Sequence, residues 1–498
     1  MNDQKIKKIA IKQSVLEGGV AFIAVFIVMF VFFRYIHPIV PWEGDDWGTL
    51  GPFITTSEYG FPIGDEYEQI MPAMLATLMG YIAAFVVYPI TGNYIAALTS
   101  VNAIALAITI AISIVAIYQF IRNYFETKIH VSLIGISFFL AFAFLMFKTH
   151  PNSQYLYWQY DLCVTYYYSI PNYLATALFL YLYTHRTSIE NKNLKPIKNG
   201  FIVAAIYLLT FSFMPAACVI AANSFWRLFE LICKTKDIKQ SAKQGWCYII
   251  SLVFFCMLIY FEFGRTFGTG YLNSDVSFVN KISVAFLFII ETFGKLHPMV
   301  KIFSIIIIVS AVWIAIRKYM RREICELDSK YFRFVWMTGR VIFVLLVYLT
   351  LLGSVSMGHL SREIIEIRMD TMYSFYSLLL LLVVVCLMYI IHQNSKAVAC
   401  IPMILLIMAY PILSHKNYFS SSMYMDSTPA QRYEIMSEIV QEAKRQDRTG
   451  EINIIAHIPY GTNPYGMPML QTLQVHDIVS HGGVIEFVYD PESDFYME

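Results

Sequence analysis

The residues best suited to chemistry are two adjacent carboxylates, Asp45 and Asp46, in the segment Pro-Trp-Glu-Gly-Asp-Asp-Trp-Gly at residues 41–48. This segment follows directly on the first long apolar run, so both side chains are expected at a membrane face. Charge close to lipid is costly unless it is paired or faces a water-filled cavity. Either the carboxylates cap a short helix in a solvated loop, or at least one of them is a general base at the bilayer surface.

Polar residues from distant parts of the chain are expected on the same membrane face as the acidic pair. Arginine side chains bind phosphate oxygens in a bidentate manner, and a nearby carboxylate can take a proton from an attacking hydroxyl while the phosphate leaves. Such groups suit sugar transfer from a polyprenyl phosphate by a single displacement with inversion. The predicted substrate-binding residues are Arg265, Arg362, Arg368, Glu262, His150, Trp158, Asp161 and His359.

Several of these residues have a second interpretation that the sequence leaves open. Arg362 stands four residues before Glu366, a spacing that also suits an ion pair on one helix. Arg265 stands three residues after Glu262, which also allows a local pair. The two histidines are either metal ligands or hydrogen-bonded structural residues. The aromatic residues between 155 and 168 either stack on sugar rings or belong to an interfacial aromatic belt.

The composition indicates a polytopic membrane protein. Of the 498 residues, 57% are hydrophobic and only 14% are charged, whereas a soluble domain averages about 25% charged residues. A formal net charge of +1 argues against a nucleic-acid partner. The eight cysteines contain no C-x-x-C pair, so neither a disulfide framework nor a zinc cluster is predicted.

The distribution of basic residues predicts the topology. Four lysines within the first twelve residues put the N-terminus in the cytoplasm. The first span, about 15–36, has no cleavage site, so we expect a retained signal anchor that delivers the acidic pair to the outer face. Within the outer loop 37–92, the apolar segment 66–90 is predicted to be interfacial or re-entrant. Counting it as a crossing would place the basic residues after the next span, 93–121, outside.

The remaining predicted spans cross the membrane in alternating directions, and this arrangement places nearly every basic cluster on one face. We expect about eleven spans, with the N-terminus inside and the C-terminus outside, and almost no charge in mid-membrane. A helical hairpin is predicted in 200–233, broken at Pro215, and 281–294 is expected along the interface. The other predicted spans are 130–147, 168–185, 245–262, 298–316, 331–353, 372–392 and 397–413.

The tail, residues 414–498, differs from the rest of the chain. Thr428 and Pro429 have the types expected at a helix N-cap and at the first helical position. The apolar residues that follow repeat at helical spacing, and 452–456 and 484–489 have the composition of short strands. We therefore expect a small α/β domain on the outer face.

This layout resembles the GT-C superfamily of integral-membrane glycosyltransferases over residues 1–413. Members carry an acidic motif in the first outer loop, interfacial helices after it, and a second outer loop that also contributes to the active site. Here Gly44-Asp45-Asp46-Trp47 stands in the place of the acidic motif and 66–90 in that of the interfacial helices. The segment from His150 to Asp161 stands in the place of the second loop.

The resemblance implies a bacterial plasma-membrane enzyme with its active site on the extracytoplasmic face. Its donor would be a polyprenyl-phosphate sugar, and its acceptor a cell-envelope glycan or lipid. By the same resemblance Asp45 or Asp46 is the general base, and Arg362 or Arg368 holds the donor phosphate. Some members use a divalent metal in this loop and others use none, so the cofactor stays open.

Two other function classes are compatible with a polytopic chain. A transporter or flippase for lipid-linked oligosaccharides is expected to carry charged or Gly/Pro-broken positions in mid-bilayer and paired halves. An envelope-polysaccharide polymerase or ligase would use the arginines on the outer face but leaves the Asp pair unexplained. Separate replacement of Asp45 and Asp46 by Asn distinguishes these classes.

Overall fold

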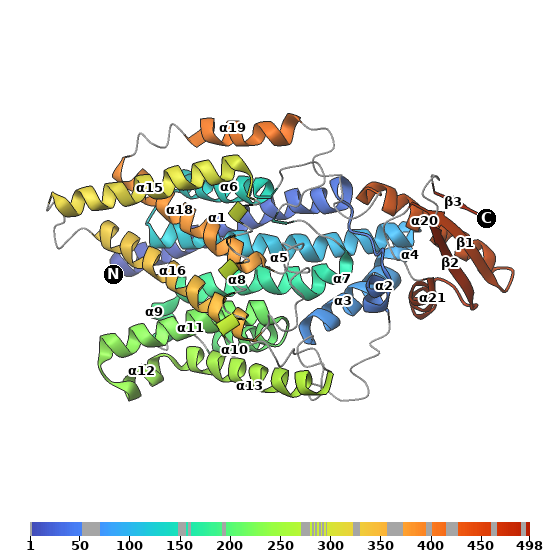
Figure 1. The fold of residues 1–498 in the computed structure, drawn as a ribbon, viewed down its shortest axis with the longest axis horizontal. Coiled ribbons are helices and arrows are strands. Elements are labelled where there is room, and N and C mark those ends of the chain that lie inside the picture. Colours follow the sequence, from blue (N-terminus) through green and yellow to red (C-terminus); the bar gives the residue numbers. More distant parts are fainter. Residues whose placement is uncertain are drawn as a thin grey trace.

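A helical bundle forms most of the chain, and a small sheet-containing domain follows it at the C-terminus (Figure 1). These features confirm the coarse part of the predicted fold class, a mostly helical chain with a small α/β domain, and the predicted count of about eleven spans and their orientation stay predictions. The computed structural model describes residues 2–51, 70–147, 156–157, 161–191, 196–269, separate positions between 279 and 294, 296–321, 329–355, 372–394, 401–414, 427–459, 466–489 and 495–498.

The long helix α5 (Tyr94–Tyr124) is central to the bundle and packs against α1 (Asn2–Val31), α6 (Ile129–Leu145) and α8 (Ile170–Thr184). Both α5 and α18 (Tyr373–Gln393) are largely buried, as expected for helices that are apolar on every side. The other long helices are α10 (Pro196–Thr210), α11 (Met214–Thr235), α13 (Trp246–Thr269), α15 (Pro298–Met320), α16 (Ser329–Val355) and α19 (Ile401–Ser414).

Seven helices among the described residues are long and apolar enough to cross a membrane. An eighth is added if α12 (Ile238–Gln244) and α13, which meet at 86°, form one span. Two further apolar helices, α6 and α10, are shorter. The predicted hairpin in 200–233 does divide into two helices, because α10 ends at Thr210 and α11 begins at Met214-Pro215.

The segment after the acidic pair contains α3 (Ile70–Ile82), η3 (Ala83–Val87) and α4 (Tyr88–Thr91), which form a helical stretch long enough to cross a membrane. Trp47 before it and Tyr94 after it both form hydrogen bonds with the C-terminal domain. This stretch is one of the seven candidate spans, so the interfacial or re-entrant placement expected for 66–90 stays a prediction.

The C-terminal domain combines two helices with a three-stranded sheet of order β2-β1-β3. Its first helix begins with a capping box in which the Thr428 side chain and the Gln431 side chain each accept the backbone N–H of the other residue. The predicted strands are confirmed: β1 pairs parallel with β2 and antiparallel with β3. The elements are α20 (Pro429–Asp447), β1 (Ile452–Ile458), α21 (Gly466–Val475), β2 (Gly483–Tyr489) and β3 (Tyr496–Met497).

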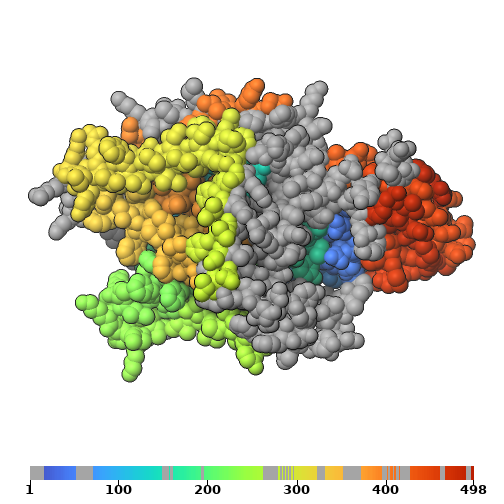
Figure 2. All heavy atoms as spheres, in the orientation of Figure 1, coloured from blue at the N-terminus to red at the C-terminus, as the bar shows by residue number. Residues whose placement is uncertain are grey.

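The two ends of the bundle differ in character (Figure 1). We call the end covered by the C-terminal domain the capped end. The opposite end carries the lysine-containing helix α12 and the basic last turns of α11 and α15, and we call it the basic end. Figure 2 shows the red surface of the C-terminal domain directly against the blue surface of the first part of the chain.

Candidate active site

The acidic pair lies on α2 (Gly44–Leu50), a short helix at the capped end. The Asp46 carboxylate is fully buried and accepts three backbone N–H groups. Its Oδ2 atom accepts from Trp42 at 2.7 Å and from Glu43 at 3.3 Å, and its Oδ1 atom accepts from Cys163 at 2.6 Å. Asp46 therefore holds the start of its own helix and a second, distant part of the chain together.

The distant part is the start of a helix that runs through α7 (Leu162–Val164) and η4 (Thr165–Ser169) into α8. The first N–H groups of a helix have no partner within it, and the helix dipole favours negative charge there. Asp161 satisfies one of these groups, because its Oδ1 atom accepts from Val164 N at 2.6 Å. Asp46 satisfies the N–H of Cys163 in the same turn.

The environment of Asp46 also changes its acidity. Burial raises the pKa of the Asp46 carboxyl to about 7, and the backbone N–H groups of Cys163 and Trp42 oppose that shift. The negative charge of Glu43 raises the pKa further. A carboxyl group that titrates near neutral pH is common at functional sites.

Asp45 is placed differently, although it is the adjacent residue. Its side chain is exposed, and its carboxylate has no hydrogen bond or ion pair with any residue that the structure describes. Its backbone carbonyl accepts from Thr49 Oγ1 at 2.6 Å, which fixes the helix turn. Asp46 is thus a buried group that joins α2 to the start of α7, whereas Asp45 is an exposed group available to a ligand.

The C-terminal domain holds α2 from the other side. Thr472 Oγ1 on α21 donates to the Trp47 carbonyl at 2.6 Å, and the Arg432 guanidinium lies 5.6 Å from the centroid of the Trp42 ring. The Tyr94 hydroxyl at the start of α5 and His476 Nδ1 share a hydrogen bond of 2.5 Å. Burial lowers the pKa of His476 to about 4, so this side chain is neutral near pH 7 and can accept that hydrogen bond.

An apolar groove on the side of the bundle leads towards α2. It consists of two adjoining cavities of about 450 and 490 Å³ that share Met71 and Leu208. The first lies among α1, α5, α8 and α10, and the second follows α3 as far as Tyr81. Thr77 in the wall of the second donates to the Thr49 carbonyl at 3.3 Å, which connects the groove to the helix that carries Asp45.

The structure brings three of the predicted site residues together: Asp45, Asp46 and Asp161. Glu262 and Arg265 lie in the last turns of α13, which runs from the basic end towards the capped end (Figure 1). His150, Trp158, His359, Arg362 and Arg368 lie outside the described residues. The predicted meeting of arginine and aspartate side chains therefore stays a prediction.

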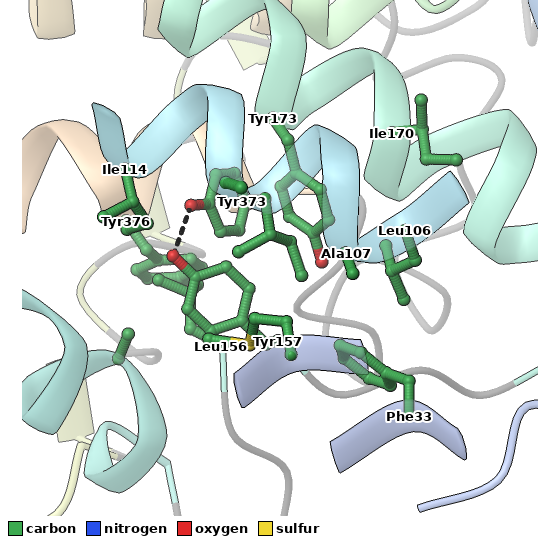
Figure 3. Close-up of a cluster of buried hydrophobic side chains, with 14 of the residues drawn as sticks. Phe33, Leu106, Ala107, Ile114, Leu156, Tyr157, Ile170, Tyr173, Tyr373 and Tyr376 are labelled. Carbon is green, nitrogen blue, oxygen red and sulfur yellow. Dashed lines mark hydrogen bonds between the residues drawn. The ribbon is translucent and has the colours of Figure 1, made fainter. Parts of the chain in front are cut away.

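Two of the aromatic residues in 155–168 fit neither of the interpretations that the sequence leaves open, sugar stacking or an interfacial belt. Tyr157 is fully buried between α5, α8 and α18, where Tyr373 donates to its hydroxyl at 3.2 Å (Figure 3). Tyr166 is also buried and donates to Asn102 Oδ1 at 2.5 Å. Both side chains contribute to the core of the bundle.

The expectation that the spans carry almost no charge is also wrong. Arg340 lies near the middle of the candidate span in α16, is 1% exposed, and donates to Asn223 Oδ1 at 2.8 Å and Glu230 Oε2 at 3.4 Å. Arg227 pairs with Glu230 and, through two bonds of 2.7 and 2.8 Å, with Glu190. Isolated charges inside apolar runs were the sequence signal for this buried ion cluster.

Within the described ranges, no group of three or more histidine, cysteine, aspartate or glutamate residues could hold a metal ion. Comparison of the chain with protein-family models, curated proteins and solved structures finds no match. The assignment of a function therefore depends on the geometry of the site and on the sequence.

Proposed function

We propose that the protein is a membrane glycosyltransferase that moves a sugar from a polyprenyl phosphate to a cell-envelope glycan or lipid. Asp45 acts as the general base that takes the proton of the acceptor hydroxyl while the anomeric carbon inverts and the lipid phosphate leaves. Asp46 positions Asp45 by fixing α2 to the start of α7. Arg265, Arg362 and Arg368 are proposed to bind the donor phosphate.

The observation that carries this proposal is an exposed, unpaired carboxylate on a helix that borders an apolar groove. A polyprenyl-phosphate donor needs both features, because its isoprenoid chain requires apolar walls and its sugar reacts at the membrane surface. The groove volumes fall within the range of about 300–1,000 Å³ typical of ligand sites.

The proposed topology places this site on the extracytoplasmic face of a bacterial plasma membrane. The basic residues at the end opposite α2 favour a cytoplasmic position for that end. Eleven spans result if α6, α8, α10, α13 and α19 cross the membrane together with the other candidate spans and the stretch from α3 to α4 is re-entrant. The N-terminus is then inside, and the C-terminal domain outside beside the acceptor.

Separate Asp45→Asn and Asp46→Asn variants test the function, with Asp477→Asn as the matched control. Asp477 is an exposed carboxylate of the C-terminal domain with φ of 52°, a conformation that asparagine tolerates. We expect D45N to lose envelope-glycan modification, measured by mass spectrometry of the glycans, with normal membrane insertion. D477N should retain it.

The same variants distinguish the alternative functions. A flippase or transporter for lipid-linked oligosaccharides would lose export of the precursor rather than the sugar-transfer step in D45N. A polysaccharide polymerase or ligase that depends on the arginines would retain activity in D45N. Retained modification in D45N would contradict the proposed role of Asp45.

A further inference from the structure

A third cavity, of about 520 Å³, lies at the basic end and is separate from the acidic helix. The end of α5, the start of α9 (Arg186–Glu190) and the first turns of α16 form its walls. Tyr124, Tyr183 and Trp336 provide aromatic surface, and Arg186 and Arg333 provide positive charge. Nothing in the proposed sugar transfer uses these residues.

The wall of this cavity carries one net positive charge. Arg186 donates to the Tyr183 carbonyl at 3.2 Å but forms no ion pair with any carboxylate that the structure describes. Arg333 donates to Glu126 Oε1 at 2.6 Å. The Glu126 side chain is 69% exposed, and a surface ion pair of this kind is weak, so an incoming anion can replace it.

The buried ion cluster fixes the aromatic part of the wall. The guanidinium carbons of Arg186 and Arg340 lie 4.3 and 4.1 Å from the centroid of the same ring, that of Tyr183. The Trp336 Nε1–H group donates to Glu230 Oε1 at 3.0 Å. The cavity is therefore built on side chains that are held in place before any ligand arrives, which lowers the cost of binding.

We propose that this cavity binds a phosphate group, with its oxygens held by Arg186 and Arg333. Arginine forks match phosphate geometry. The exposed side chains of Phe332 and Trp336 flank the cavity at the level where a membrane-water interface is expected. Basic pockets between spans on the cytoplasmic side are suited to anionic lipid headgroups. An anionic phospholipid is therefore the source that this arrangement favours, and a soluble phosphate is the other.

Lipid retention by the full-length protein tests the site. The protein is reconstituted in nanodiscs of phosphatidylcholine that contain a minor share of phosphatidylglycerol, and bound phosphatidylglycerol is counted by native mass spectrometry. Arg186→Gln should reduce its retention by about tenfold, because one charge-assisted contact is lost. Glu126→Gln should increase retention, because it frees Arg333. Lys234→Gln, which removes an exposed charge at the same end outside the cavity, should match the wild type.

A parallel measurement identifies the source of the phosphate. Inorganic phosphate is titrated into the detergent-solubilised protein, and the unfolding temperature is recorded. If R186Q retains less phosphatidylglycerol than the wild type, the result supports a lipid headgroup. If inorganic phosphate raises the unfolding temperature of R186Q less than that of the wild type, the result supports a soluble ligand. Equal behaviour of R186Q and K234Q in both measurements would overturn the proposal. If R186Q does not fold, E126Q serves as the test instead. An E126Q protein that shows no gain over the wild type in lipid retention or in stabilisation by phosphate would also overturn the proposal.

Discussion

Replacement of Gly80 by alanine tests whether α3 and the C-terminal domain hold the acidic helix as the structure shows. Gly80 lies inside α3, where alanine would normally stabilise the helix by about 1 kcal/mol. A Cβ atom at this position would lie 2.7 Å from the Leu50 carbonyl oxygen and 3.1 Å from His476 Cε1. Overpacking of this kind costs about 1–3 kcal/mol, so the clash should offset or exceed the gain in helix propensity.

Gly200→Ala is the matched control, because Gly200 is an exposed position in α10 with open space around its Cβ. We expect G200A to unfold at a temperature equal to or above that of the wild type, and G80A to unfold at a lower temperature. Limited proteolysis should also release the C-terminal domain faster from G80A than from G200A. A G80A protein as stable as G200A, with equal protease resistance, would refute the close contact between α3, α2 and the C-terminal domain.

Four other variants test the charges of the structure. The folded pKa of Asp46, about 7, exceeds its ordinary value of 3.8, so its contribution to stability is complete below about pH 4 and is lost as the pH rises through 7. His476 behaves oppositely: its contribution is complete above about pH 6.5 and is lost as the pH falls through 4. Asp46→Asn keeps the His476 contribution, so its unfolding temperature should rise with pH between about pH 4 and 6.5. His476→Gln keeps the Asp46 contribution, so its unfolding temperature should fall over the same range. Equal slopes would contradict both assignments. Glu230→Gln should cost about 3–5 kcal/mol of unfolding free energy, because it leaves the buried Arg340 without its carboxylate partner. Glu442→Gln, at an exposed pair with Arg445, should change the unfolding temperature little, and an equally large loss there would argue against the importance of burial.

Much of the fold could be predicted from local patterns. Long apolar runs predict the helices, since each must bury its surface in lipid or against a neighbour. Pro215 marks the start of α11 because proline is tolerated only in the first turn of a helix. Thr428 marks the start of α20 because its side chain satisfies a free N–H there. These features depend on a few neighbouring residues.

The different placement of the two aspartates, with Asp46 buried and Asp45 exposed, could not be predicted in the same way. It depends on the contact of Asp46 with Cys163, 117 residues later in the chain. The docking of the C-terminal domain depends on pairs such as Trp47 with Thr472, which are 425 residues apart. Such contacts follow from tertiary packing, and neither composition nor periodicity records them.

Photo-crosslinking with a polyprenyl phosphate that carries a photoreactive group on its isoprenoid chain tests the central proposal most directly. Adducts mapped by mass spectrometry should fall on the groove, at Met71, Met74 and Leu78 of α3 and at Leu208 of α10. Unlabelled polyprenyl phosphate should compete for these positions. Adducts that avoid the groove, or that gather at the basic end, would contradict a donor site beside Asp45.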